Sequence, residues 1–362
     1  GIELAAEEAG YEAGDHTFEL VIADDELNPE VGVNRLERLM TSDQVDVVIG
    51  PIAGNVGVAA GDWACETGMP LVIAYAAAED NTMRDRCDNV VRPGWTGAQP
   101  MFAFGEYVAQ QGWTDIVMVG EDYAFPHNQL GGFLKTFCRA GGEHVTKIYH
   151  PLGQDDFASI IATMPDADAV LYNGSGSDAA AFFNQYQQFG MLDRMPLLGG
   201  SNFYLPGMLR QMGEGALGGL SALQYTDVLD TPENNAFVSA FEEKYGKAPS
   251  APAEHGYVAM HQVMDAIAAA GVQDRDAFVE ALRAFEMDAP RGPISIDDYG
   301  NVVQNIYINE VQRVDGELKN VPIQTFEAVS QFGPFDPEEY MSDPRDSADF
   351  PPGDCSDPYY QD

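Results

Sequence analysis

The stretch "GEDYAFPHNQLGGF" at residues 120–133 gathers side chains that are able to do chemistry. Its first eight residues contain two acids, two aromatic residues and a histidine, which are Glu121, Asp122, Tyr123, Phe125 and His127. Such a set could transfer protons in an enzyme, hold a metal ion, or close over a small molecule. The rest of the sequence decides among these three kinds of site.

Motifs of enzymes and metal sites are missing or incomplete. The chain has neither a G-x-S-x-G nucleophile elbow nor a Walker loop. "GSGSDA" (174–179) matches G-x-G-x-x-A, but the next expected strand ends in "LLGGS", without the acid that would hold a ribose. The six histidines include no i,i+4 pair. We therefore expect no catalytic residues, no metal and no cofactor, and a tight strand-to-helix turn explains these glycines.

Short loops after five expected strands carry the remaining signal. These loops are "GPIAGNVG" (50–57), "AYAAAED" (74–80), "GEDYAFPHN" (120–128), "NGSGSD" (173–178) and "GGSNFY" (199–204). They contain small residues, hydroxyls, amides and aromatic rings, but no Lys or Arg. N–H groups at helix N-termini can hold an anion without a salt bridge, and Tyr123, Phe125, Phe203 and Tyr204 could supply apolar walls. The pattern favours binding over catalysis.

The elements that position these loops alternate between strand and helix patterns. Expected strands are 17–24, 45–51, 70–76, 114–120, 144–150, 168–174, 195–201 and 217–223. Continuous Val/Ile/Leu runs between helices are typical of parallel sheets buried on both faces, and ligands of such sheets bind beyond the carboxyl ends of the strands. So many strands fit two sheets better than one.

The chain changes character after residue 225. Three successive helix patterns are followed by a hairpin with its turn at Asp315-Gly316. The residues from Pro334 onward are rich in Pro, Asp and Ser, and we expect an irregular acidic tail. The start, "GIELAAEEAG", reads as the middle of a helix without a cap, so a signal sequence and a first strand are expected to lie outside this sequence.

Charge restricts the possible partners. The 362 residues include 58 Asp+Glu and 18 Lys+Arg, which gives a formal net charge of -40. Such a surface repels nucleic acids and anionic membranes, and both are excluded as partners. The acids are spread evenly, so we interpret them as a halophilic adaptation to a salty medium. No apolar run is long enough for membrane insertion.

The four cysteines leave two interpretations open at this point. Cys65 and Cys87 would close a loop of about 20 residues, worth roughly 3 kcal/mol of stability. An even number suits disulfides in an oxidising compartment, whereas buried free thiols would also fit the composition. The other two are Cys138 and Cys355, and whether they pair stays open.

Taken in order, these pieces resemble the type I periplasmic solute-binding proteins of ABC importers, above all the branched-chain amino acid (Leu/Ile/Val-type) binding family. "ADDELNPEVGVNRLERLM" resembles the family's D-x-x-x-x-P segment and second helix. "VVRPGWTGAQ" is similar to its F-R-x-x-x-x-x-x-Q crossover, and "GYVAMHQVMDAIAAAG" to its Y-x-A helix. "GEDYAFP" resembles its D-Y-x-x-G strand end, with Pro126 in place of the glycine.

The resemblance implies an α/β fold of two Rossmann-like lobes, with a hinge and an interlobe ligand cleft. The expected N-terminal lobe is 1–97 plus 226–298, the C-terminal lobe is 98–225 plus 299–335, and the tail is 336–362. The absent first strand would be the family's first strand. The position of Cys65 and Cys87 matches a disulfide that family members often carry, so the resemblance favours that bridge.

The resemblance also implies a set of ligand-binding residues. They are Gly54, Asn55, Ala76, Ala77, Ala78, Tyr123, Phe125, Ser175, Gly176, Ser201 and Asn202. Ser201 falls where amino-acid binders often place an acid for the ligand's ammonium group, which argues against an α-amino ligand. Relatives whose loops look like "EDYAF" and "PLGQDDF" are associated with aromatic acids. The implied ligand is an amino acid or a carboxylate, with a preference for an aromatic acid.

The implied function is that of the solute-binding component of an ABC importer, a non-enzymatic monomer in the periplasm or outside the cell. Its partners would be a small-molecule ligand and the membrane permease. The alternative is a ligand-sensing domain of a receptor, or an amide or amino-acid regulator with the same fold. Asp122 is expected to fasten its loop, and His127 is expected to take no part in the site.

Overall fold

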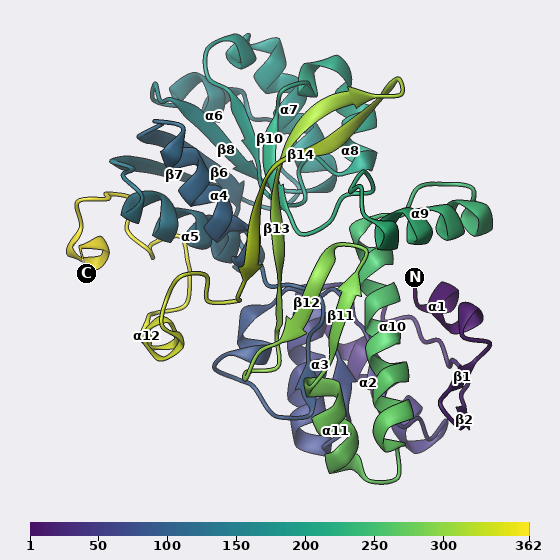
Figure 1. Cartoon of the computed structure of the whole chain (residues 1–362). Helices are drawn as coiled ribbons and strands as arrows, with labels where there is room; N and C mark the ends of the chain where they lie inside the picture. The colour runs from purple at the N-terminus through teal and green to yellow at the C-terminus, as the bar shows by residue number, and fades with distance from the viewer. Residues whose placement is uncertain (362) are drawn as a thin grey trace. The chain divides into compact units, whose positions relative to one another are not determined.

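The computed structural model describes residues 1–361, and these separate into two compact units (Figure 1). Unit 1 comprises Gly1–Thr96 and Leu229–Asn305, and unit 2 comprises the residues from Gly97 to Val228 and from Ile306 onward. None of the helices in residues 1–361 has both the length and the apolar character needed to cross a membrane.

Unit 2 is built on a mostly parallel sheet. The parallel strands are β6 (Asp115–Glu121), β7 (His144–His150), β8 (Ala169–Asn173), β9 (Leu197–Gly199) and β10 (Leu220–Leu223). Their order is β7-β6-β8-β9-β10, and β10 pairs antiparallel with β13 (Val302–Val314). β14 (Glu317–Val329) follows β13 through the turn at Asp315-Gly316 and pairs with it, which confirms the predicted hairpin.

Helices cover both faces of this sheet. α4 (Gln99–Gln110) and α5 (Ala124–Arg139) pack with Ile116 and Met118 on one face. α6 (Ala158–Thr163), α7 (Gly176–Gln188) and α8 (Pro206–Met212) pack with Val117 and Val119 on the other. Successive side chains of a strand point to opposite faces, so a strand buried on both sides must be continuously apolar. This is the pattern that predicted these strands.

Unit 1 contains a smaller parallel sheet in the order β3-β4-β5, which are Val48–Ile49, Leu71–Val72 and Val90–Val91. Its helices are α1 (Ile2–Glu8), α2 (Pro29–Thr41), α3 (Gly54–Thr67), α9 (Pro232–Tyr245), α10 (Ala251–Ala270) and α11 (Arg275–Arg283). The last three are the three helices predicted after residue 225. β11 (Glu286–Ala289) and β12 (Gly292–Ile296) form a hairpin, and β12 pairs with the start of β13.

The predicted strand at 17–24 is wrong for most of its length. Only β2 (His16–Thr17) is paired, with β1 (Glu12–Ala13). Within residues 1–361, the backbone of residues 19–23 makes no hydrogen bond to other backbone. The physical reason is that a strand needs a neighbour for its N–H and C=O groups, and none lies beside this segment.

The tail is more ordered than the sequence predicted. It carries α12 (Pro337–Ser342) and the short 3₁₀ helix η4 (Pro358–Tyr360). The Lys135 ammonium of α5 pairs with Asp346 at 2.8 Å, and both side chains are buried. The Val145 N–H of β7 donates to the Gly353 carbonyl at 2.8 Å. These long-range contacts fix the tail to unit 2, although its composition is typical of loops.

Both possible disulfides are present. Cys65 is bonded to Cys87, and Cys138 is bonded to Cys355. The first bridge links the end of α3 to the segment before β5, within unit 1, and the second links α5 to the tail, within unit 2. The interpretation as buried free thiols is therefore wrong.

Candidate functional site

The predicted site residues lie at the carboxyl ends of parallel strands in each unit. In unit 1, Gly54 and Asn55 are the first two residues of α3, just after β3. No side chain caps this helix, so its first N–H groups are open to a ligand, and the helix dipole favours negative charge there. The Ala76 N–H donates to the Pro51 carbonyl at 3.1 Å. This bond ties the loop after β4 to the loop before α3.

The second loop of unit 1, Ala76–Ala78, offers backbone groups only. A Cβ atom added at Gly57 would lie 2.7 Å from the Ala76 Cβ, so the glycine lets this loop approach the first turn of α3. Within residues 1–361, the N–H groups of Ala77 and Ala78 donate no hydrogen bond. These two loops of unit 1 therefore present N–H donors and contain no cationic side chain, as the sequence indicates.

Tyr123 in unit 2 stands at the start of α5, where it occupies the N-cap position with an extended backbone. Glu121, the last residue of β6, lies close enough for its charge to act on the Tyr123 hydroxyl. Burial raises the pKa of Tyr123, and the neighbouring Glu121 charge raises it further. Phe125 is half-buried in the first turn of α5. Pro126 also fits there, because a first-turn N–H has no partner inside the helix.

Glu121 belongs to the opening stretch but was not among the predicted ligand-binding residues. It is buried, and its Oε1 accepts a hydrogen bond from the Ser175 N–H at 3.2 Å. Burial raises the pKa of this carboxyl, and the Asp178 charge adds to the rise. The signal was present in the alternation of β6, since Glu121 continues the face of Val117 and Val119 beyond the core. The carboxylate links the ends of β6 and β8 beneath Tyr123.

Ser175 and Gly176 begin α7, where Ser175 is the N-cap and Gly176 has a φ of 58°. Asp178 is buried in the first turn of this helix and accepts the N–H groups of Gly153 and Gln154, at 2.7 and 3.2 Å. It holds the loop after β7 against α7. The sequence had not singled out this carboxylate, whose partners are about 25 residues away in the chain.

Ser201 and Asn202 follow β9, and Ser201 is buried with its N–H donating to the Gln129 Oε1 at 3.1 Å. The prediction that Phe203 and Tyr204 supply apolar walls of the site is wrong. Both rings are buried in the core of unit 2. The Tyr204 hydroxyl donates to the Leu197 carbonyl at 2.8 Å. An aromatic residue after a strand can thus turn inward, which local sequence does not show.

Asp122 and His127 of the opening stretch are joined by a hydrogen bond. The His127 Nε2 lies 3.0 Å from the Asp122 Oδ1, and the Asp122 N–H donates to the His150 carbonyl at 2.8 Å. His127 also packs edge-on against Tyr149. These contacts agree with the expectation that Asp122 fastens its loop. They also give His127 a partner within the protein.

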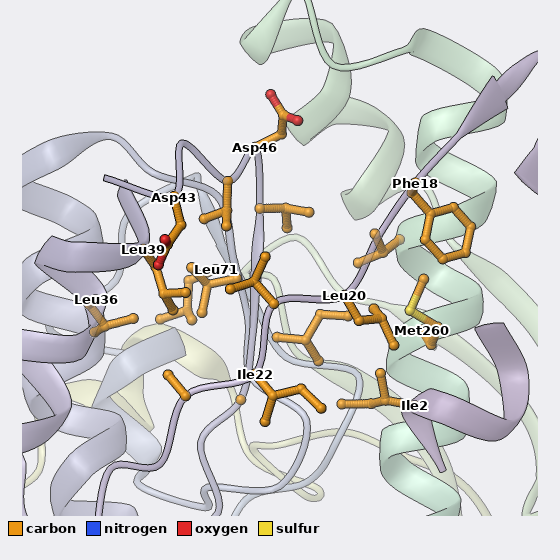
Figure 2. A pocket seen from close by; sticks show the side chains of 18 of the residues that line it. Ile2, Phe18, Leu20, Ile22, Leu36, Leu39, Asp43, Asp46, Leu71 and Met260 are labelled. Atoms are coloured by element: carbon orange, nitrogen blue, oxygen red, sulfur yellow. The ribbon is translucent and has the colours of Figure 1, made fainter. Parts of the chain in front are cut away.

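Unit 1 also holds an apolar groove of about 690 Å³ (Figure 2). Phe18, Leu20 and Met260 line one side, and Leu36 and Leu39 line the other. The groove runs along β3, the edge strand of its sheet, and contains none of the predicted ligand-binding residues. Its apolar walls suit a strand buried on both faces. The first strand expected outside this sequence stays a prediction.

Comparison with known proteins gives the family. A family model described as periplasmic binding protein matches residues 1–317. A Leu/Ile/Val-binding protein homolog 6 from Brucella melitensis is 30% identical over 342 residues, which cover 90% of this chain and 86% of that protein.

Two solved structures extend the comparison to the fold. An ABC transporter substrate-binding protein from Sphaerobacter thermophilus is 28% identical with a TM-score of 0.87, covering 91% of this chain and 92% of that chain. A solute-binding protein of an ABC transporter from Rhodopseudomonas palustris BisB5, solved with 3,4-dihydroxybenzoic acid, is 29% identical with a TM-score of 0.84 and the same coverage. The chain therefore belongs to the type I periplasmic binding proteins of the branched-chain amino acid family.

Proposed function

We propose that this chain is the extracytoplasmic solute-binding component of an ABC importer, and that its strand-end loops bind a small aromatic carboxylate. The observation that carries the proposal is the chemistry of the strand-end loops. Unit 1 offers uncharged N–H donors at the start of α3 and at Ala77 and Ala78. Unit 2 offers Tyr123 beside the buried Glu121 carboxylate.

The donors of unit 1 and the acceptors of unit 2 suit the two kinds of polar group on a hydroxylated aromatic acid. The donors of unit 1 match a carboxylate. The Glu121 carboxylate and Tyr123 hydroxyl match a phenolic hydroxyl, which can donate a hydrogen bond to them. The 3,4-dihydroxybenzoic acid bound by the Rhodopseudomonas relative has both groups. A branched-chain amino acid lacks the hydroxyl, and Ser201 offers no charge for its ammonium group.

A thermal-shift and calorimetry series tests the ligand class. We expect 3,4-dihydroxybenzoate and 4-hydroxybenzoate to raise the melting temperature more than leucine, and the neutral 4-hydroxybenzamide to give no shift. A ligand at about 100 times its dissociation constant stabilises the native state by about 2.7 kcal/mol. A shift with leucine alone would contradict the aromatic acid and would indicate an amino acid as the ligand. No shift with any of these compounds would contradict both ligand classes.

Variants at Tyr123 test the site. Tyr123→Ala should raise the dissociation constant of 4-hydroxybenzoate more than tenfold in calorimetry, with the melting temperature of the ligand-free protein nearly unchanged, because the side chain is only half-buried. Tyr11→Ala, at an exposed tyrosine of unit 1, is the control and should bind as the unaltered chain does. If Tyr123→Ala binds 4-hydroxybenzoate with the same affinity as the unaltered chain, Tyr123 is not part of the site.

The proposal includes a membrane permease as partner and a location outside the cytoplasm. Two disulfides support that location, because such bonds persist in oxidising compartments. Deletion of the gene should abolish uptake of the labelled aromatic acid by whole cells, and expression from a plasmid should restore it. Normal uptake in the deletion strain would contradict the transport role.

A further inference from the structure

Arg92 is a fully buried cation in unit 1, one residue beyond β5. Burial lowers the pKa of its guanidinium to about 10, and the nearby Glu79, Asp297 and Asp80 charges oppose the shift. The group is therefore still protonated at neutral pH. A buried charge is tolerated only where hydrogen bonds replace its water shell. The hydrogen-bond partners of Arg92 therefore indicate which part of the structure it stabilises.

Those partners are concentrated in the loop that follows β4. Arg92 Nη1 donates to the carbonyls of Ala78 and Ala76, the latter at 3.5 Å. Nη2 donates to the Glu79 carbonyl at 3.3 Å and to the Thr82 hydroxyl. The remaining donor, Nε, reaches the Asn301 Oδ1 at 2.6 Å. One planar guanidinium thus gathers several backbone carbonyls of residues 76–79 on a single side of the loop.

This arrangement orients the loop's donors. In a trans peptide the C=O and N–H groups point in opposite directions. Because the Ala76 and Ala78 carbonyls face Arg92, the N–H groups of the same peptide units, those of Ala77 and Glu79, face away from it. At the start of the loop, the Ala76 N–H donates to the Pro51 carbonyl at 3.1 Å. The guanidinium and this bond together fix the loop.

We propose that Arg92 is a positioning residue for ligand binding, which holds the Ala76–Ala78 loop so that the Ala77 N–H meets the ligand's carboxylate. The inference rests on the proposed function, since it takes the ligand to be a carboxylate. Arg92 acts through the loop and does not touch the ligand. Its charge lies behind the carbonyls, where it polarises their peptide units and strengthens the N–H donors on the other side.

Arginine is required by this geometry because its donors form a rigid fork. A lysine would keep the charge but could donate to only some of these acceptors. Arg92→Lys therefore tests the hydrogen bonds of the guanidinium while the positive charge is kept. The matched control is Arg283→Lys, also in unit 1, where a guanidinium donates to the backbone carbonyls of Asp298 at 2.6 Å and Asp88 at 3.5 Å, away from the predicted site.

The experiment combines two measurements on the full chain. Hydrogen exchange followed by mass spectrometry reports the peptides that cover residues 74–83 without ligand. Calorimetry reports the dissociation constant of 4-hydroxybenzoate. For Arg92→Lys we expect exchange in residues 74–83 at least tenfold faster, and a dissociation constant at least tenfold higher. Arg283→Lys should leave both unchanged. If Arg92→Lys does not fold, Thr82→Val, which removes one acceptor of the guanidinium, should give smaller changes in the same directions.

Each outcome has a distinct meaning. Unchanged exchange in residues 74–83 overturns the positioning role, whatever the affinity. Faster exchange with unchanged affinity overturns the link between the loop and the ligand. If the unaltered chain binds none of the tested carboxylates, the proposed function fails, and the exchange measurement still decides whether Arg92 orders the loop.

Discussion

Glu121 places a carboxyl group at the end of β6, in a buried position where ionisation is disfavoured, so the pKa of this group lies above its ordinary value. A carboxyl whose pKa is raised by folding takes up a proton when the chain folds. The unfavourable effect on stability is absent below the ordinary pKa of glutamate. It grows as the pH rises towards the folded pKa and is complete above that value.

Glu121→Gln should therefore raise the melting temperature of the ligand-free protein at pH 7, and the gain should disappear towards pH 4. Glutamine keeps an oxygen that can accept the Ser175 N–H, so the variant removes mainly the charge. Thermal unfolding from pH 4 to pH 8 measures the effect. Glu310→Gln, at a half-buried carboxyl of β13, serves as the control. A gain that is the same at every pH would contradict the assigned cause.

At the scale of elements, the tail is held by an ion pair between Lys135 of α5 and Asp346, whose side chains are 3% and 2% exposed. The Lys135 ammonium also lies 4.3 Å from the ring centre of Tyr340, in α12. Removal of one partner leaves a buried charge without compensation, which typically destabilises by about 3–5 kcal/mol. Asp346→Ala should lower the free energy of unfolding by about that amount in urea titrations.

Asp166→Ala is the matched control, because Asp166 also pairs with a cation at 2.8 Å, but with both side chains exposed. Such surface pairs contribute little, so its effect should be much smaller. Similar losses for the two variants would show that the buried pair is not what holds the tail.

The elements also show how far sequence reasoning reaches. The strands of unit 2 were predictable because burial on both faces demands unbroken apolar runs such as Ile116–Val119. The segment 17–24 has such a run but no partner strand, so its residues form no ladder. The order in the tail depends on contacts such as that between Lys135 and Asp346, 211 positions apart, which no local pattern contains.

The same limit applies to the site. The positions of Tyr123, Ser175 and Gly54 at strand ends and helix starts were predictable from the sequence, whereas their contact with a ligand stays a prediction. The contacts of Glu121 and Arg92 were not predictable, since they are made with carbonyls, hydroxyls and N–H groups from distant parts of the chain. Phe203 and Tyr204 were misjudged because a position after a strand does not fix whether a ring turns towards the core or away from it.

At the scale of the whole molecule, the net charge of -40 should make stability depend on salt. Like charges spread over a folded surface repel one another, and unfolding relieves the repulsion. Added salt shortens the screening length from about 10 Å at 0.1 M to about 3 Å at 1 M. We expect the melting temperature to rise steeply with potassium chloride over this range.

Two controls separate screening from other effects of salt. Sucrose at equal osmolality favours the compact state through exclusion from the protein surface, and it should not reproduce the steep rise. Lowering the pH towards the ordinary pKa of the acids removes charge directly, so the dependence on potassium chloride should weaken there. A melting temperature that is independent of salt at pH 7 would show that self-repulsion is not significant, and would contradict the interpretation of the acidic surface as a halophilic adaptation.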